Sequence, residues 1–368
     1  MNTSASPSNP SSQQPLIVAK PPAGPLRIIR EQPSRGLLGR FGRWAMGTLL
    51  GISILMNISL LGNEQTLDGE HTVKERYHSL ERSAHDKIGI ITVEGAIMHS
   101  DGFIKHQIDH VRKDKNVKAV VLRIDSPGGT VTGSDYLYHH LQELIRDRDI
   151  PMVVSMGGIA ASGGYYLAMA AGDKPVIFAE PSTWTGSVGV IIPHYDVSGL
   201  LERFDVVDDS ISSDPMKQMG SLTRKWPKEE HEKEMAIMKG LVDASFARFK
   251  EIVLASRSPL RNNPEWQETV FSGRVFAADQ AKANGLVDEL GYIENAIDKA
   301  IKLAGLKKDH VEVVKYVKQA GLLDQLLVGA QGESRSQREL AALLELSAPR
   351  AYYLSSWLPV LSASSAKP

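Results

Sequence analysis

The residues best placed for chemistry surround Ser162, in the stretch Gly157 to Tyr166 that reads GGIAASGGYY. A strand-like apolar run at 151–156 leads into this stretch, and an alanine-rich run with helical character at 165–171 follows it. Ser162 is therefore expected at a strand-to-helix turn with little side-chain bulk around it. Small residues let the backbone approach a ligand closely and leave the N–H groups of a helix start able to bind negative charge. This environment suits a serine nucleophile.

A second glycine-rich turn, Ser126-Pro127-Gly128-Gly129, also follows a strand-like run, at 117–124. If the two strands are neighbours in a parallel sheet, both turns emerge at the edge where α/β proteins commonly place their sites. One turn would supply the nucleophile and the other would supply backbone donors. Acyl transfer needs both, because preorganised N–H groups must meet the oxyanion of the tetrahedral intermediate.

A serine nucleophile also needs a base, and the residues leave two kinds open. Among the histidines, His194 with Asp196 is the best candidate for a histidine triad. The alternative is Lys217, which lies among small and uncharged residues and acts as a base if burial lowers its pKa.

The rest of the folded region alternates strand-like and helical patterns, which predicts a mainly parallel, right-handed layered α/β architecture. A polar stretch without a clear period, 210–222, is expected to be a loop or an edge segment. The sequence predicts strands at 88–97, 117–124, 151–156, 174–179, 186–192 and 311–317, and helices at 103–113, 132–146, 197–204, 228–255, 278–284 and 293–304.

The N-terminal part has a different character. Residues 1–43 are rich in Ser, Pro, Gln and Asn and predict a disordered tail. The uncharged apolar run at 44–62 has about the length that spans a bilayer, and the arginines before it place the tail in the cytoplasm. A cleaved signal peptide is the alternative, but the long preamble argues against it. We therefore expect a single-pass anchor in a bacterial inner membrane, then a linker at 63–86 and an extracytoplasmic catalytic domain.

Composition excludes several classes of function. The formal net charge of -1 gives no broad electrostatic case for nucleic-acid binding. The chain has no cysteine, so it has no thiolate nucleophile and no cysteine-ligated metal. Neither glycine turn carries the lysine pattern of a phosphate-binding loop. We expect no metal and no cofactor.

The stretch from Lys87 to Tyr316 resembles the signal peptide peptidase family of serine proteases, in its short, single-repeat bacterial form. Several landmarks occur in the family's order, and they cover about 230 of the 368 residues. They are ITVEG at 91–95, RIDSPGG at 123–129, AASGGYY at 160–166, TGSVGV at 185–190, the Lys217 segment, SGRVF at 272–276 and the run 281–291. The resemblance implies a fold akin to the Clp protease subunit and the crotonases, with a protease domain at 87–317 and a C-terminal extension at 318–368.

The family's roles carry over to matching positions. Ser162 would be the nucleophile, Lys217 the general base and Ser187 the residue that helps to hold the lysine. The oxyanion hole would be formed by backbone N–H groups of Gly128, Gly129 and Gly163. The family usually has a Ser-Gly pair shortly before the lysine, whereas this chain has Ser212-Ser213, so Lys225 is the fallback.

The leading hypothesis is thus a membrane-anchored serine endopeptidase with a Ser-Lys dyad that cleaves apolar peptides, among them remnant signal peptides. The resemblance also implies a homo-oligomer with active sites at subunit interfaces, and it leaves open whether Lys217 serves its own chain or a neighbour. Two rivals remain: a crotonase-type acyl-CoA hydratase or isomerase, and a non-catalytic membrane scaffold of the same fold.

Overall fold

In the computed structural model the chain divides into two units, Met1–Gly62 and Asn63–Pro368. The described residues are Trp44, 46–51, Ser53, 73–172, 175–318 and, as backbone, 352–354. The predicted tail 1–43 and most of the predicted membrane segment 44–62 lie outside them. Within the described part of the chain, no helix combines the length and the apolar character needed to cross a membrane.

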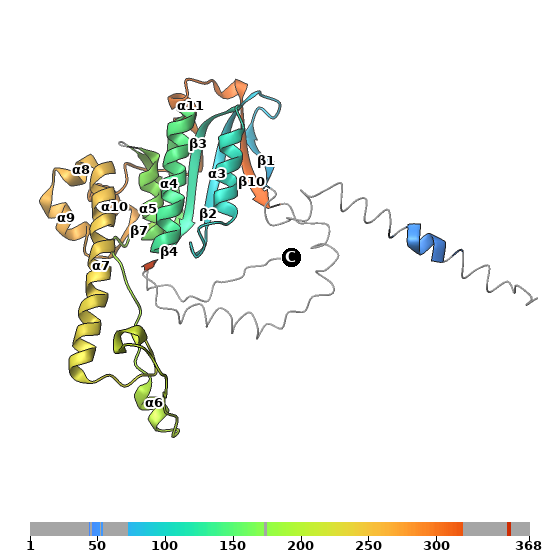
Figure 1. Cartoon of the computed structure of the whole chain (residues 1–368). Coiled ribbons are helices and arrows are strands. Elements are labelled where there is room, and N and C mark those ends of the chain that lie inside the picture. Colours follow the sequence, from blue (N-terminus) through green and yellow to red (C-terminus); the bar gives the residue numbers. More distant parts are fainter. Residues whose placement is uncertain are drawn as a thin grey trace, which may run out of the picture. The chain divides into compact units, whose positions relative to one another are not determined.

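One large sheet forms the centre of the second unit (Figure 1). In the described part of the chain it has nine strands in the order β1-β10-β2-β3-β5-β6-β9, with β7 beside β5 and β8 beside β7. The strands are β1 (Val73–Leu80), β2 (Asp86–Glu94), β3 (Val117–Ser126), β5 (Met152–Ala161), β6 (Val176–Ala179), β7 (Trp184–Gly186), β8 (Val275–Ala277), β9 (Glu289–Leu290) and β10 (Val311–Lys318). Only the β1–β10 and β7–β8 pairs among them are antiparallel, so the predicted parallel-dominated α/β architecture is confirmed.

Both faces of this sheet are buried, which explains why its central strands read as nearly continuous apolar runs. In β2, Ile91 and Val93 belong to the larger core cluster, whereas Ile88 and Ile90 belong to the smaller one. Successive strand residues point to opposite faces, so the two clusters lie on the two sides of the sheet. The smaller cluster includes Ile297 and its neighbours on α11 (Ile293–Leu303), and the larger one includes residues of α3 (Phe103–Lys113), α4 (Val131–Arg148) and α5 (Gly163–Ala168).

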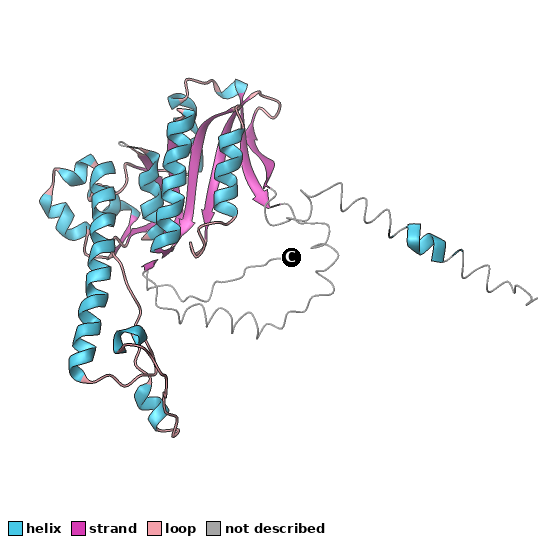
Figure 2. Ribbon diagram, viewed as in Figure 1, coloured by secondary structure: helices cyan, strands magenta, loops and turns pink. Residues whose placement is uncertain are grey.

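Helices α3, α4 and α5 pack on one face of the sheet and α11 on the other, and the chain has further helices that lie away from the sheet (Figure 2). Their bounds are α3 (Phe103–Lys113), α4 (Val131–Arg148), α5 (Gly163–Ala168), α6 (Ser198–Glu202), α7 (Lys228–Ser256), α8 (Ser258–Arg261), α9 (Pro264–Val270), α10 (Ala278–Ala283) and α11 (Ile293–Leu303), with 3-10 turns η1 (Met169–Ala171), η2 (Pro215–Gln218) and η3 (Lys308–His310).

The segment 191–244, here called the arm, projects from this layered body and contains α6, η2 and the first part of α7. The end of α7 is anchored in the body, because Phe249 and Val253 are fully buried in the larger core cluster. A hydrogen bond inside the arm joins its loop to α7, because the buried Glu234 carboxylate accepts the Gly220 N–H at 2.6 Å. Figure 1 shows α7 leading away from the sheet toward α6.

The structure differs from the sequence-based expectations in several places. The strand expected at 186–192 ends at Gly186, because Ser187 has a φ of 52°, which an extended strand does not allow. The stretch 63–86 expected as a linker contains β1, which forms the edge of the sheet beside β10. The C-terminal extension contributes a short strand, β11 (Tyr352–Leu354), that pairs with β4 (Gly128–Thr130).

Candidate active site

Ser162 lies where β5 ends and α5 begins, as the sequence predicts. Its φ of 53° and ψ of -116° fall outside the regions that residues with a side chain readily adopt. Its N–H donates to the Gly186 carbonyl at 2.8 Å, a contact that helps to hold the sharp turn. Such strain, about 1–3 kcal/mol, persists where surrounding structure enforces it, and it concentrates at functional sites.

Gly163 and Gly164 follow Ser162, and both positions require glycine because the backbone there lies against the second glycine turn. A Cβ added to Gly163 would meet Ser134 Oγ at 2.4 Å and the Gly129 nitrogen at 3.1 Å. A Cβ on Gly164 would meet the Ser126 carbonyl oxygen at 2.8 Å. The structure therefore brings the two glycine turns into direct contact.

The second turn is held by hydrogen bonds that determine which of its N–H groups remain available. Ser126 Oγ donates to the Gly95 carbonyl at 2.6 Å and accepts the Gly128 N–H at 3.2 Å. The Gly128 N–H is therefore engaged within the turn. Of the three glycines predicted for the oxyanion hole, Gly129 and Gly163 are better placed to donate.

The backbone of Ile97 lies along one side of Gly129 and forms hydrogen bonds with the residues before and after it. The Ile97 N–H donates to the Gly128 carbonyl at 2.8 Å, and the Thr130 N–H donates to the Ile97 carbonyl at 2.9 Å. Because backbone groups of successive strand residues point to opposite sides, the N–H and C=O of Gly129 point away from Ile97. A Cβ on Gly129 would lie only 2.0 Å from the Ile97 oxygen, so this position excludes any side chain.

A charged network supports the strands that carry both turns. The Asp125 carboxylate accepts the Ile159 N–H at 3.1 Å and thereby joins the ends of β3 and β5. Arg123 donates to Ser155 Oγ at 3.0 Å and to the Glu180 carboxylate at 2.6 Å. These groups position the site but do not line it.

Two buried hydroxyls at the site have no hydrogen-bond partner among the described residues: Ser162 Oγ and Ser134 Oγ. Ser134 lies in the first turns of α4, beside Gly163. Sequence reasoning missed it, because a serine near a helix start is common and carries no distinguishing pattern. An unpaired buried hydroxyl is costly, so both atoms are suited to a partner that arrives with substrate or with another subunit.

Ser187 lies next to Ser162 in space. Ala161 pairs with Gly186 in the parallel β5–β7 ladder, and each is followed by a serine with positive φ. The Ser187 N–H donates to the Arg274 carbonyl at 2.8 Å, which fixes the backbone there.

Among the described residues, no side chain that could act as a base forms a hydrogen bond with Ser162 Oγ. Lys217 is exposed in η2 on the arm, and it makes no hydrogen bond to Ser162 Oγ. The fallback Lys225 forms an ion pair with Glu202 at 2.6 Å, and this hydrogen bond raises the pKa of Lys225. A raised pKa keeps the amine protonated, which is the opposite of what a general base needs.

The histidine alternative is not assembled either. Asp196 accepts the Ser198 N–H at 2.9 Å, and the hydrogen bonds from Ser198 lower the pKa of its carboxyl. Among the described residues, His194 Nε2 is buried without a hydrogen-bond partner, so it does not contact Ser162 Oγ.

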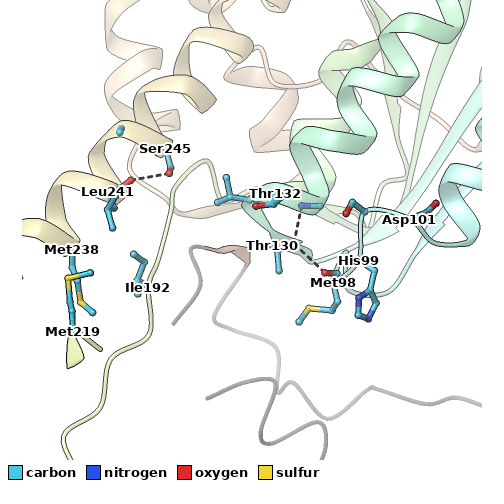
Figure 3. Close-up of a pocket in the computed structure, with 14 residues that line it drawn as sticks. Met98, His99, Asp101, Thr130, Thr132, Ile192, Met219, Met238, Leu241 and Ser245 are labelled. Carbon is cyan, nitrogen blue, oxygen red and sulfur yellow. Dashed lines mark hydrogen bonds between the residues drawn. The ribbon is translucent and has the colours of Figure 1, made fainter. Parts of the chain in front are cut away.

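A pocket of about 890 Å³ lies beside β4, between the start of α4 and the arm (Figure 3). Thr130, Val131 and Thr132 form one wall. Apolar side chains of the arm form the opposite wall, namely Ile192, Met219, Met238 and Leu241, and Met98 lies on the side of Thr130 (Figure 3). Unbranched methionines adapt to varied apolar ligands, so the pocket suits an apolar side chain.

A group of potential metal ligands, His139, His140 and Glu143, lies on α4 outside this site. Its carboxylate is already engaged, because Arg112 donates to Glu143 at 3.4 Å and Arg146 lies 3.7 Å from it. Two guanidinium groups at the carboxylate oppose a cation there.

Comparison with known proteins points to one enzyme family. Residues 145–307 match the family model described as Peptidase family S49. Protease 4 of Salmonella typhi is 34% identical over 270 residues, which are 71% of this chain and 41% of that protein. The protein slr0021 of Synechocystis sp., named as an inferred protease, is 38% identical over 63% of this chain and 79% of its own length.

A protein of Enterococcus faecium, named as an inferred signal peptide peptidase SppA, is 36% identical over 59% of this chain and 64% of its own length. The match with the Salmonella protein thus spans less than half of that longer relative.

Proposed function

This chain belongs to peptidase family S49, and on that premise we propose that it is a serine endopeptidase in which Ser162 is the nucleophile and Lys217 the general base. The observation that carries the proposal is the contact between the two glycine turns. It combines a strained serine at a strand-to-helix turn with N–H groups of Gly129 and Gly163 beside it. An acyl-transfer site needs a nucleophile and oxyanion donors in this relation.

In the proposed reaction, neutral Lys217 takes the proton of Ser162 as Oγ attacks a peptide carbonyl. The oxyanion of the tetrahedral intermediate accepts hydrogen bonds from the N–H groups of Gly129 and Gly163, within the predicted hole that also includes Gly128. Lys217 then protonates the leaving amine, and water hydrolyses the acyl-enzyme with the lysine again as base. Ser187 is assigned to orient the lysine amine.

The lysine is proposed to come from a neighbouring copy of the chain. Two observations support this: Lys217 is exposed in the single chain, and the arm that carries it exposes large apolar side chains. The most exposed are Tyr195, Phe204, Val207 and Ile211, which are 67–100% exposed. Several large apolar side chains exposed on one segment favour an interaction surface there. Packing of arms in a homo-oligomer would bury it and desolvate Lys217, which lowers a lysine's pKa.

The proposed substrates are apolar peptides, including signal peptides released from exported precursors. The apolar pocket beside β4 supports this class, as do relatives whose names include signal peptide peptidase. The segment 44–62 is proposed as a single-pass anchor in a bacterial inner membrane, with the catalytic domain outside the cytoplasm. The finer fold assignment, a βαβ superhelix like that of the Clp protease subunit and the crotonases, belongs to the same proposal.

A fluorophosphonate probe tests the proposal on the full chain in detergent. The expected result is covalent labelling at Ser162, located by peptide mapping, with loss of labelling and of peptide turnover in Ser162→Ala. Labelling elsewhere would contradict the assignment. A crotonase-type enzyme would leave Ser162 unlabelled, and a scaffold would turn over peptide no faster than Ser162→Ala does.

A further inference from the structure

Lys217 lies on a short turn of the arm whose backbone is held on both sides by charged side chains. Before the lysine, the Pro215 carbonyl accepts a hydrogen bond from the Arg224 guanidinium at 2.9 Å. After it, the Gly220 N–H donates to the Glu234 carboxylate at 2.6 Å. The 3-10 turn η2, which carries the lysine, lies between these two contacts. The place of the proposed base in the arm therefore depends on both of them.

Both contacts lead to one side of α7. Arg224 also donates to the Glu230 carboxylate at 3.1 Å, so it links the turn to the start of this helix. Glu230, Glu234 and Met238 follow one another every four residues, which places them on the same side of the helix. Met238 lines the pocket beside β4, on the same wall as Met219 (Figure 3). One side of α7 thus serves both the turn and the pocket.

α7 connects this arrangement to the body of the protein. Near the end of the helix, Phe249 and Val253 are fully buried in the larger core cluster, so this end is fixed against the sheet. Figure 1 shows the same helix continuing into the arm. Sites held by helices are more precise than sites held by loops alone. Side chains of α7 are therefore well suited to set the position of the turn.

Glu234 is a rare kind of residue for a buried position. Its side chain is fully buried, although a glutamate is almost never buried unless a partner compensates its charge. Among the described residues, its Oε2 has no hydrogen-bond partner and lies 3.5 Å from His231 Nδ1. An apolar residue would fill this space without the cost of a buried carboxylate. The Gly220 N–H that the carboxylate accepts is thus the contact that explains a glutamate here.

We propose that Glu234 and Arg224 are positioning residues for the reaction, which hold the turn so that the Lys217 amine reaches the Ser162 of a neighbouring chain. They act through the backbone of the turn and do not touch the reacting atoms. A misplacement of about 1 Å at a reacting group lowers the rate about a hundredfold, so loss of either contact is expected to lower kcat. This inference rests on the proposed function.

The first test measures kcat for a fluorogenic apolar peptide, with full chains in detergent. Glu234→Met has a similar length but cannot accept the Gly220 N–H, and it is expected to lower kcat about thirtyfold or more. Glu234→Gln keeps an acceptor oxygen and is expected to retain at least about a third of the wild-type kcat. Glu229→Met is the control, because it makes the same change at an exposed site of α7, where only an exposed ion pair with Lys233 is lost; its kcat should match the wild type.

The second test separates positioning of the lysine from a general loss of stability. It uses mixed oligomers of two variants in equal amounts, purified through two different tags. When Glu234→Met is mixed with Ser162→Ala, the first chain supplies intact serines and the second supplies correctly held lysines, so turnover should recover to about a quarter of the wild-type rate. When Glu234→Met is mixed with Lys217→Ala, neither chain supplies a correctly held lysine, so turnover should not exceed that of Glu234→Met alone. A general defect would not distinguish the two partners.

Arg224→Met is expected to behave like Glu234→Met, and it carries both tests if Glu234→Met does not assemble. Failure of both variants to assemble would show a structural role and overturn the inference. A kcat of Glu234→Met within about threefold of the wild type, a Glu234→Gln chain no faster than Glu234→Met, or recovery with Lys217→Ala would overturn it too. The same holds if Glu234→Met does not recover with Ser162→Ala while the reference pair, Ser162→Ala with Lys217→Ala, recovers. Failure of the proposed function is distinguishable, because wild-type chains would then show neither labelling at Ser162 nor peptide turnover.

Discussion

Replacement of Gly129 by alanine tests the proposed oxyanion hole most locally. The new Cβ would lie 2.0 Å from the Ile97 oxygen and 2.4 Å from the Ile97 carbonyl carbon, both backbone atoms that cannot rotate away. Relief of the overlap requires the turn to move by roughly 1 Å or more, which misdirects the Gly129 N–H. Loss of one oxyanion donor costs about 2.7–4 kcal/mol, or 10²–10³ in kcat. Overpacking of this kind also costs about 1–3 kcal/mol of folding stability.

The assay compares kcat/KM for a fluorogenic apolar peptide with the thermal midpoint of unfolding, both for the full chain in detergent. Gly102→Ala is the matched control, because its Cβ meets nothing within 4 Å and its φ is -127°. We expect Gly129→Ala to lose activity at least a hundredfold while it remains folded, and Gly102→Ala to keep it. A Gly129→Ala protein that is folded and retains activity within about threefold would refute the assignment of this donor.

Three further predictions follow from individual contacts. Lys225→Ala should change peptide turnover less than about twofold, because the ion pair with Glu202 keeps the Lys225 amine charged; a large loss would reinstate Lys225 as base. Arg257→Met should lower the free energy of unfolding by about 1.5–3 kcal/mol in urea titration, because it removes the two hydrogen bonds from the buried guanidinium to Asp288, whose side chain is 34% exposed; a cost below about 0.5 kcal/mol would contradict this. Burial raises the pKa of Tyr316, so the folded state favours the neutral phenol and the free energy of unfolding should fall as pH rises above about 10. In urea titrations at several pH values, Tyr316→Phe should show a weaker dependence of this free energy on pH, and an equal dependence in both proteins would contradict the prediction.

Much of the fold was predictable because its strands carry strong local signals. β2, β3 and β5 are apolar runs bounded by glycine-rich turns, and buried parallel strands require this pattern. The edge strand β1 was not predicted, since VKERYHSL is polar and alternates only weakly. Its pairing with β10 connects residues more than two hundred positions apart, and such a partner cannot be read from a local window.

Part of the geometry of the candidate site follows from the sequence. The glycine-rich turns at Ser162 and at Gly128–Gly129 mark positions where the backbone approaches closely, and the structure brings these two turns into contact. The engagement of the Gly128 N–H by Ser126 Oγ depends on a side-chain rotamer, and the position of Ser134 depends on how α4 packs. The position of Lys217 relative to Ser162 could not be predicted from the sequence, because it depends on the direction in which the arm projects.

The central claim is that the Ser162 of one chain is served by the Lys217 of another, and co-assembly tests it most directly. Ser162→Ala and Lys217→Ala chains, each inactive alone, are co-expressed in equal amounts and purified as mixed oligomers through two different tags. Random mixing in a ring with head-to-tail interfaces pairs an intact serine with an intact lysine at about a quarter of the sites, so peptide turnover should recover to about a quarter of the wild-type rate. Mixed oligomers that form but show no turnover would contradict the account.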